Sequence, residues 1–231
     1  EIIETEILLS DLESIQKRLE KNNKKKIEKD ELSFLEECEK LISDGKKPDE
    51  LKKKYSKNLI KKSALLSLKP RIIVCNVDEK SLPDGNKYSD SCKKRFPYEN
   101  IIIVCADIED QIMNLERKDR KDFMFASGIK STGLDNLIKT GYNALGLSTF
   151  FTSGPEESRA WTIEKNSNAS EAAGVIHTDF KKKFIRAETT THEDFVKYKG
   201  FNECRNAGKL RLEGKDYLVN DGDVMYFRVG S

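Results

Sequence analysis

The sequence lacks long hydrophobic runs and is poor in the residues that usually mark catalytic or metal sites. No stretch approaches the roughly 18 consecutive apolar residues of a membrane-spanning helix. Only two histidines occur, and the five cysteines are an odd number without a C-x-x-C pair. These absences argue against a membrane protein, a disulfide framework and a zinc site, and they favour a reducing, cytoplasmic compartment.

An excess of charge of one sign is also missing. The 231 residues carry 42 Lys and Arg against 40 Asp and Glu, a formal net charge of +2. Residues 150–231 alone carry 13 basic and 13 acidic groups. Non-specific binding to nucleic acid, which depends on pooled Lys and Arg, is therefore not the default interpretation.

The first 69 residues show the periodicity of amphipathic helices. Apolar residues recur three and four positions apart over 2–20 and again over 27–43, with a polar loop between. Two such helices predict an antiparallel hairpin, and a further helix is predicted over 50–67. The lysines at 24–26 could meet an anionic partner, although a solvated loop is the simpler interpretation.

The period changes at residue 70. The runs 71–76 and 101–105 are short, apolar and rich in β-branched residues, which predicts buried parallel strands. A short helix or loop over 86–95 lies between them, and a helix follows over 131–146. This β–α–β rhythm predicts an α/β segment.

From residue 148 onward, short alternating runs are separated by turn signals. One helix is predicted over 169–176, and His177-Thr178-Asp179 follow it. Because no nucleophile lies nearby in sequence, structural hydrogen bonds are favoured for these three residues over acid–base chemistry. The predicted strands are 148–152, 159–164, 183–189, 216–219 and 223–229. The pattern is that of a compact α+β domain with a mixed sheet.

The strand over 71–76 ends in Asn76-Val77-Asp78-Glu79, and the strand over 101–105 leads into Cys105-Ala106. Ligands of doubly wound sheets bind outside the carboxyl ends of the strands. An Asn amide both donates and accepts hydrogen bonds, so it can form hydrogen bonds with the edge of a heterocyclic base. Two such strand ends can form a slot for a base, but an Asn after a strand is often only a turn residue.

A phosphate site is absent from the sequence. No G-x-x-x-x-G-K-[ST] run occurs, and no D-x-x-G. A base slot without a phosphate cradle leads us to expect that the phosphate-binding half lies upstream of Glu1.

Several longer runs carry a resemblance to a known family. These runs are 142–163, 172–180, 184–188, 208–217 and 221–224. They resemble the Obg-like ATPase family, the YchF subfamily of translation-factor P-loop NTPases. Asn76–Glu79 resembles the N-x-x-E of that family, which stands where GTPases have N-K-x-D, and the helical hairpin resembles its coiled-coil arm.

The resemblance implies three parts. Residues 1–69 would form the coiled-coil arm and return helix, residues 70–147 the base-recognition half of a P-loop nucleotide-binding domain, and residues 148–231 a TGS domain with an α+β β-grasp fold. The parent protein is expected to bind ATP and Mg²⁺ and to hydrolyse ATP in association with translation. This chain, without P-loop, switches and Mg²⁺ ligands, is expected to be inactive alone.

The resemblance also implies an adenine site built from Asn76, Val77, Glu79, Cys105 and Ala106. In N-K-x-D the Asp carboxylate accepts hydrogen bonds from guanine N1–H and N2–H₂. Here Glu79, one methylene longer, stands in that place, and adenine offers no such pair of donors.

The last implication concerns partners. The family expectation is contact with the ribosome or RNA, and neither a membrane nor DNA is expected. Trp161 and Phe184 are favoured as core residues. The basic candidates for contact are Arg159, Lys181, Lys182, Lys183, Arg186 and Arg211.

Alternatively, the arm and TGS domain act as a non-catalytic docking module. An RNA-binding β-grasp domain of the synthetase or stringent-response type is a weaker option, because the N-x-x-E strand and the arm do not fit it.

Overall fold

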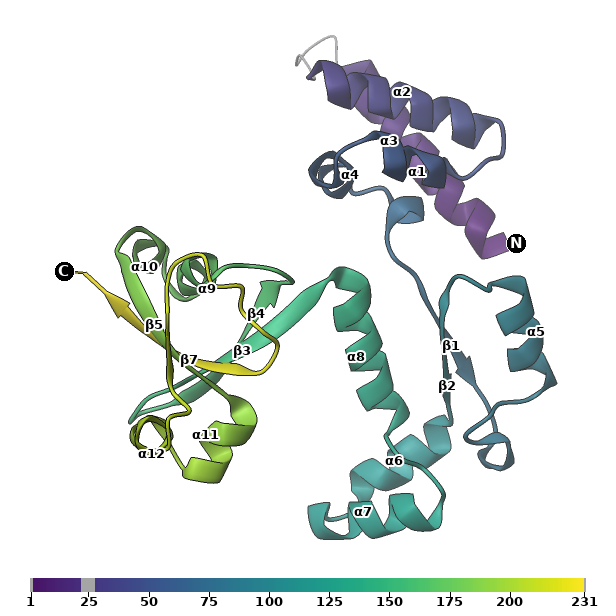
Figure 1. The fold of residues 1–231 in the computed structure, drawn as a ribbon. Coiled ribbons are helices and arrows are strands. Elements are labelled where there is room, and N and C mark those ends of the chain that lie inside the picture. The colour runs from purple at the N-terminus through teal and green to yellow at the C-terminus, as the bar shows by residue number, and fades with distance from the viewer. Residues whose placement is uncertain (1, 22–27, 231) are drawn as a thin grey trace. The chain divides into compact units, whose positions relative to one another are not determined.

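The computed structural model describes residues 2–21 and 28–230, which form two compact units, 1–71 and 72–231 (Figure 1). The lysine run at 24–26, proposed above as a contact for an anion, lies outside the described residues. Within the described ranges, every helix is too short or too polar to cross a membrane.

The first unit is a helical hairpin followed by short helices. Its helices are α1 (Ile2–Lys21), α2 (Lys29–Ser43), η1 (Pro48–Glu50), α3 (Leu51–Lys54), α4 (Lys57–Ser63) and η2 (Leu66–Leu68). Ile15 of α1 and Phe34, Leu35 and Cys38 of α2 are fully buried in one hydrophobic core. The two predicted helices therefore pack through their apolar stripes, as amphipathic helices must to bury them.

The single helix predicted over 50–67 is wrong, because the backbone breaks twice. Tyr55 is extended (φ −108°, ψ 157°) and ends α3. The Ser56 side chain then accepts a hydrogen bond from the backbone N–H of Leu59, which starts α4 as a new N-cap. Ala64 adopts the left-handed conformation (φ 58°) and ends α4.

A buried carboxylate ties α1 to the end of this unit. Asp11 is 2% exposed. Its two oxygens accept hydrogen bonds of 2.8 Å each from the backbone N–H groups of Leu66 and Ser67. These groups belong to η2, near the end of the first unit. The two charge-assisted hydrogen bonds offset the free-energy cost of removing the Asp11 carboxylate from water.

The second unit opens with two parallel strands, β1 (Ile72–Asn76) and β2 (Asn100–Val104), joined through η3 (Glu79–Ser81) and α5 (Lys87–Arg95). The two predicted strands are confirmed, with Ile73 paired to Ile101 and Asn76 to Val104. Three helices follow: α6 (Ala106–Asn114), α7 (Arg117–Ala126) and α8 (Gly133–Leu145). Helices α6 and α7 were not predicted, although Ile108 and Ile112 of α6 are buried at helical spacing.

The start of α8 is fixed against α6 and β2. Glu109 of α6 accepts hydrogen bonds from the backbone N–H groups of Gly133 (2.5 Å) and Leu134 (3.3 Å), which places a carboxylate at the helix N-terminus. Thr132 is the N-cap of α8, and its side chain accepts a hydrogen bond from the backbone N–H of Asp135. A Cβ at Gly133 would lie 2.6 Å from Val104 of β2, so only glycine permits this close approach.

Several apolar side chains of α8 are exposed in the structure. Leu134, Ile138 and Leu145 are 48%, 51% and 63% exposed. Val74 of β1 is exposed as well. Apolar surface of this kind normally indicates contact with further protein.

A five-stranded mixed sheet forms the rest of the second unit. Its strands are β3 (Leu147–Ser153), β4 (Ser158–Glu164), β5 (Phe184–Thr191), β6 (Arg211–Glu213) and β7 (Asp223–Val229), in the order β4-β3-β7-β5-β6. β3 and β7 are parallel, and the other neighbours are antiparallel.

The strand predicted over 216–219 is wrong. Leu218 makes only an isolated bridge to Asn168, and the edge strand lies earlier, at β6.

Helices lie on both faces of this sheet. They are α9 (Ala169–Ile176), α10 (Thr178–Lys182), α11 (His192–Tyr198) and α12 (Phe201–Asn206). Phe150, Ala172 and Met225 are fully buried in the core under α9, and Trp161 and Phe184 pack against that core, as predicted. His177 Nδ1 accepts a hydrogen bond from the backbone N–H of Asp179 (3.2 Å), which confirms a structural capping role.

Replacing Asp11 by Ala should lower the free energy of unfolding by about 2–4 kcal/mol, because two backbone N–H groups lose a charged acceptor. Urea denaturation of the whole chain followed by circular dichroism measures this loss.

Glu13→Ala is the matched control for Asp11→Ala. Glu13 lies on the same helix but makes only an exposed ion pair with Lys17. This variant should leave the urea concentration at the midpoint of unfolding unchanged. Equal destabilisation by the two substitutions would show that the Asp11 hydrogen bonds contribute nothing specific.

Candidate functional site

The carboxyl ends of β1 and β2 meet through a side chain. Asn76 Oδ1 accepts a hydrogen bond of 3.0 Å from the backbone N–H of Ala106. Ala106 is the first residue of α6, and both residues are exposed. The bond uses the acceptor of the amide, and the Nδ2 donor stays at the exposed strand end. The structure thus brings together two residues that the sequence places 30 positions apart.

Two of the predicted site residues are buried. The backbone N–H of Val77 donates to Val104 O (2.8 Å), and its side chain is buried. Cys105 is 2% exposed and packs in a hydrophobic cluster with Ile108 and Ile112. Any contact of Cys105 with a ligand at this edge would therefore involve its backbone.

Glu79 lies on the exposed side of this edge. It begins η3 and lines a pocket of about 380 Å³ together with Lys80, Leu82, Ile108, Ser127 and Ile129. The pocket combines one carboxylate and one ammonium with three aliphatic side chains. Asn76 and Ala106 do not line it. Leu82, Ile108, Ser127 and Ile129 were not predicted as site residues, since they lie outside the N-x-x-E pattern.

Electrostatics near this edge involve a pair of thiols. Burial raises the pKa of the Cys75 thiol, and its interaction with the Cys92 thiol of α5 raises that pKa further. Cys75 is therefore a protonated thiol near neutral pH and a poor nucleophile. In the part of the chain that the structure describes, no group of three or more His, Cys, Asp or Glu side chains could hold a metal ion.

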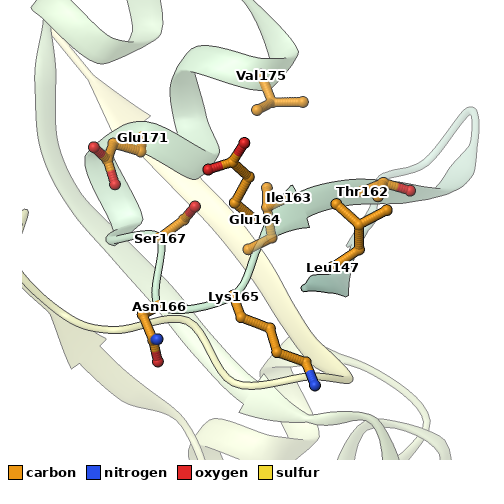
Figure 2. A pocket seen from close by; sticks show the side chains of 9 residues that line it. All are labelled: Leu147, Thr162, Ile163, Glu164, Lys165, Asn166, Ser167, Glu171 and Val175. Carbon is orange, nitrogen blue, oxygen red and sulfur yellow. The ribbon is translucent and has the colours of Figure 1, made fainter. Parts of the chain in front are cut away.

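A second pocket, of about 450 Å³, lies around the loop between β4 and α9 (Figure 2). Several of its polar groups already have structural partners. Glu171 completes a capping box with Asn168 at the start of α9, and Lys165 Nζ donates to Asn143 Oδ1 (2.9 Å). None of the predicted site residues lines this pocket.

The basic candidates have different surroundings. The Arg159 guanidinium stacks over the Trp161 ring at 4.2 Å from its centroid. Lys181 and Lys182 are exposed in α10, and Lys183 follows them. Arg186 is exposed on β5.

Arg211 belongs to a hydrogen-bond network around the buried carboxylate of Asp223. It binds Asp223 (3.3 Å) and the Tyr217 hydroxyl (2.9 Å), and that hydroxyl donates to Asp223 (2.7 Å). Burial and the hydrogen bond to Asp223 raise the pKa of Tyr217 to about 12. The Arg211 guanidinium therefore holds β6 against the start of β7.

One charged cluster was not foreseen. Glu188 on β5 is buried and accepts from Arg205 of α12 (2.7 Å) and from Arg228 of β7 (3.1 Å). A Glu in an alternating strand is a weak sequence signal, and its partners lie 17 and 40 residues away.

Comparisons with known proteins agree with this architecture. A family model named YchF-GTPase_C, described as a protein of unknown function (DUF933), matches residues 147–230. The chain is 42% identical to the "Ribosome-binding ATPase YchF" of Haemophilus ducreyi over 236 residues, covering 99% of this chain and 65% of that protein. It is also 42% identical to the protein of the same name from Bacillus subtilis, with the same coverage.

Comparison with solved structures also finds similarity to a YchF protein. The YchF GTPase of Schizosaccharomyces pombe superimposes with a TM-score of 0.79 at 33% identity, covering 98% of this chain and 64% of that one. A GTP binding protein from Pyrococcus horikoshii, at 19% identity and a TM-score of 0.58, shares the fold.

The chain is a mixed α/β protein with a TGS-like C-terminal domain. It belongs to the YchF family. It spans 65% of the length of the curated relatives named above.

Asn76→Ala should expose the Ala106 amide to exchange. Removing the acceptor frees this N–H, so its hydrogen–deuterium exchange should accelerate by up to about tenfold. Asn76→Asp keeps an acceptor and should preserve protection. Mass spectrometry or NMR of the exchanging chain measures both, and equal exchange in the two variants would contradict the bond.

Proposed function

We propose that this chain supplies the base-recognition edge of a nucleoside-triphosphatase that acts on ATP in association with the ribosome. The hydrogen bond between Asn76 Oδ1 and Ala106 N is the observation that carries this proposal. It joins two exposed strand ends at the edge of a sheet where nucleotides bind in α/β folds. The proposal is supported by relatives named ribosome-binding ATPases.

The site residues have separate tasks in this proposal. Asn76 Nδ2 donates to a ring nitrogen of adenine, because its Oδ1 is already held by Ala106. The backbone at Val77, Cys105 and Ala106 lines the slot, since the first two side chains are buried. Glu79 excludes guanine by placing its carboxylate out of reach of the N1–H and N2–H₂ pair.

The residues named above would contact only the base of ATP. Its triphosphate would be bound by other parts of the whole protein. The triphosphate and Mg²⁺ would be bound by the P-loop and switch regions expected upstream of Glu1. Residues 70–147 are then half of a nucleotide-binding domain, the hairpin α1–α2 is a coiled-coil arm, and residues 148–231 form a β-grasp TGS domain. The exposed apolar face of α8 supports this division, because a complete domain would bury such a face.

Glu79→Asp in the whole protein should lower its preference for ATP over GTP by about tenfold. The shorter carboxylate takes the position that accepts from guanine N1–H and N2–H₂, and unpaired donors are costly to bury. Affinities for the two nucleotides, measured by titration calorimetry, give the ratio.

Glu116→Asp serves as the control for this experiment. Glu116 precedes α7, is exposed and pairs with Lys118, so the same change there should leave the ratio as it was. An unchanged ratio in Glu79→Asp as well would show that Glu79 does not set nucleotide selectivity.

A second candidate function is a non-catalytic docking module made of the arm and the C-terminal domain. It is favoured by the exposed cations of the C-terminal domain, chiefly Lys181–Lys183 and Arg186. These act as local patches, because the charge of residues 150–231 is balanced overall.

The chain should co-sediment with ribosomes at about 0.1 M salt and dissociate at about 0.5 M, since contacts through surface cations are screened. Centrifugation through a sucrose cushion with immunodetection in the pellet measures this. Failure to pellet at low salt, with the fold intact by circular dichroism, would count against docking by this part of the protein.

A further inference from the structure

The two edges of the C-terminal sheet differ in length. The edge strand β6 has three residues, whereas β4 at the opposite edge has seven. β4 pairs with β3 in an unbroken register from Leu147–Glu164 to Ser153–Ser158, and its sequence contains no proline. Native sheets usually protect an edge by a short strand, a bulge or a proline, because its backbone groups attract a further strand. β4 has none of these three features, so its edge is suited to pairing.

The hydrogen bond at the end of the β3–β4 ladder shows which backbone groups of β4 point to the open edge. The N–H of Lys165, directly after β4, donates to Gly146 O (2.7 Å). Hydrogen-bonded and non-bonded pairs alternate in an antiparallel ladder, so residues an even number of positions before Lys165 bond to β3. These residues are Arg159, Trp161 and Ile163. The outward N–H and C=O groups belong to Ser158, Ala160 and Thr162.

The pocket of about 450 Å³ in Figure 2 lies at the C-terminal end of this edge. Its lining includes the last three residues of β4, 162–164, and Val175 of α9. Ile163 is buried, and Val175 is 48% exposed. A strand added along β4 would pass this pocket, and one of its side chains would pack there against aliphatic groups.

Carboxylates accompany these aliphatic groups. Glu164 and Glu171 both line the pocket, and the Lys165 ammonium beside them donates to Asn143 Oδ1 (2.9 Å). An aliphatic surface next to carboxylates suits the stem and the cation of an Arg or Lys side chain. The strand that fits this edge therefore carries a basic residue.

β4 itself carries a residue of this kind. Arg159 is exposed near the other end of the strand, and its guanidinium lies over the Trp161 ring. If two copies of β4 pair antiparallel about a two-fold axis at Trp161, Arg159 of one copy lies opposite Ile163 of the other. Each Arg159 then lies beside the acidic pocket of the second copy. The strand is thus self-complementary, as an isologous interface requires.

The same register also pairs the outward backbone groups. Ala160 of one copy lies opposite Thr162 of the other, and both residues point their N–H and C=O groups to the open edge. Among residues 2–21 and 28–230, no strand pairs with this edge. Two β4 strands would therefore exchange N–H···O bonds in both directions and leave the ladder with β3 intact.

We propose that this chain forms a two-fold symmetric dimer through the edges of β4, with Arg159 of each copy in the acidic pocket of the other. The two C-terminal sheets then become one continuous sheet. A second copy is favoured over an unrelated peptide, because one strand supplies both the cation and the pocket. The contact is a single strand on each side, so the dimer is weak and depends on concentration. Neither the nucleotide edge nor ribosome contact enters this proposal.

Sedimentation velocity of the whole chain between about 1 µM and about 1 mM should show a monomer–dimer equilibrium. Arg159→Glu should raise the dimer dissociation constant at least about tenfold, because it places an additional carboxylate at each acidic pocket. Arg159→Lys keeps the charge and should retain most of the affinity. Ala160→Pro should abolish the dimer, because proline removes an outward N–H without removing a bond to β3. Circular dichroism checks that each variant is folded.

Arg186→Glu is the matched control, since Arg186 is an exposed arginine on β5 of the same sheet and undergoes the same charge change. It should dimerise as the unmodified chain does. Equal weakening by Arg159→Glu and Arg186→Glu would overturn the β4 interface and indicate an effect of net charge. An unmodified chain that stays monomeric up to about 1 mM would overturn the dimer itself.

Amide hydrogen exchange followed by NMR locates the interface. Between low and high protein concentration, exchange at Ala160 and Thr162 should slow at least about fivefold. Trp161 and Ile163 are bonded to β3 in monomer and dimer and should stay equally protected. A dimer without added protection at Ala160 and Thr162 would use another surface and overturn the proposal. Protection of both amides that does not change with concentration would show that the chain itself covers this edge, which overturns it as well.

Discussion

The hydrogen bond between Asn76 Oδ1 and Ala106 N is the contact on which the arrangement of β1, β2 and α6 depends. It closes the carboxyl edge of β1 and β2 and fixes where α6 begins. Glu109 of α6 then receives the first N–H groups of α8, and Gly133 lets that helix approach β2. A side chain at a strand end thus positions two helices, and it is the same side chain that faces the proposed ligand. In the proposed function, stability and recognition would be coupled at this point, because one amide group provides both an acceptor and a donor.

The C-terminal domain uses a buried carboxylate in a comparable way. Glu188 would be costly to bury alone, and Arg205 and Arg228 offset that cost through charge-assisted hydrogen bonds. The result is an ordered pair of guanidinium planes beside Arg186. Asp223 plays the equivalent role at the other end of β7, where its carboxylate accepts from Arg211 and from the Tyr217 hydroxyl. Both carboxylates are buried, and the arginines that bind them remain partly exposed.

Periodicity predicted most long elements because their burial pattern is local. The strands over 71–76 and 101–105 and the helix over 169–176 are confirmed within one or two residues. The helix over 50–67 was wrong because its breaks depend on Tyr55 and Ala64, whose backbone conformations carry no periodic signal. The helices α6 and α7 were missed, and the strand over 216–219 was wrong. That segment instead carries the Tyr217 hydroxyl to Asp223, so a tertiary contact decided its conformation.

The sequence by itself determined the family, the parallel strands and the residues at their carboxyl ends, because these are carried by contiguous runs. Only the tertiary structure decided which of those residues are exposed. It buried Val77 and Cys105, left Asn76 and Ala106 at the surface, and placed Glu79 in a pocket with Ile108 of α6 and residues that follow α7. It also joined Glu188 to arginines 17 and 40 residues away. Contacts between distant segments depend on strand register and helix packing, which no local pattern encodes.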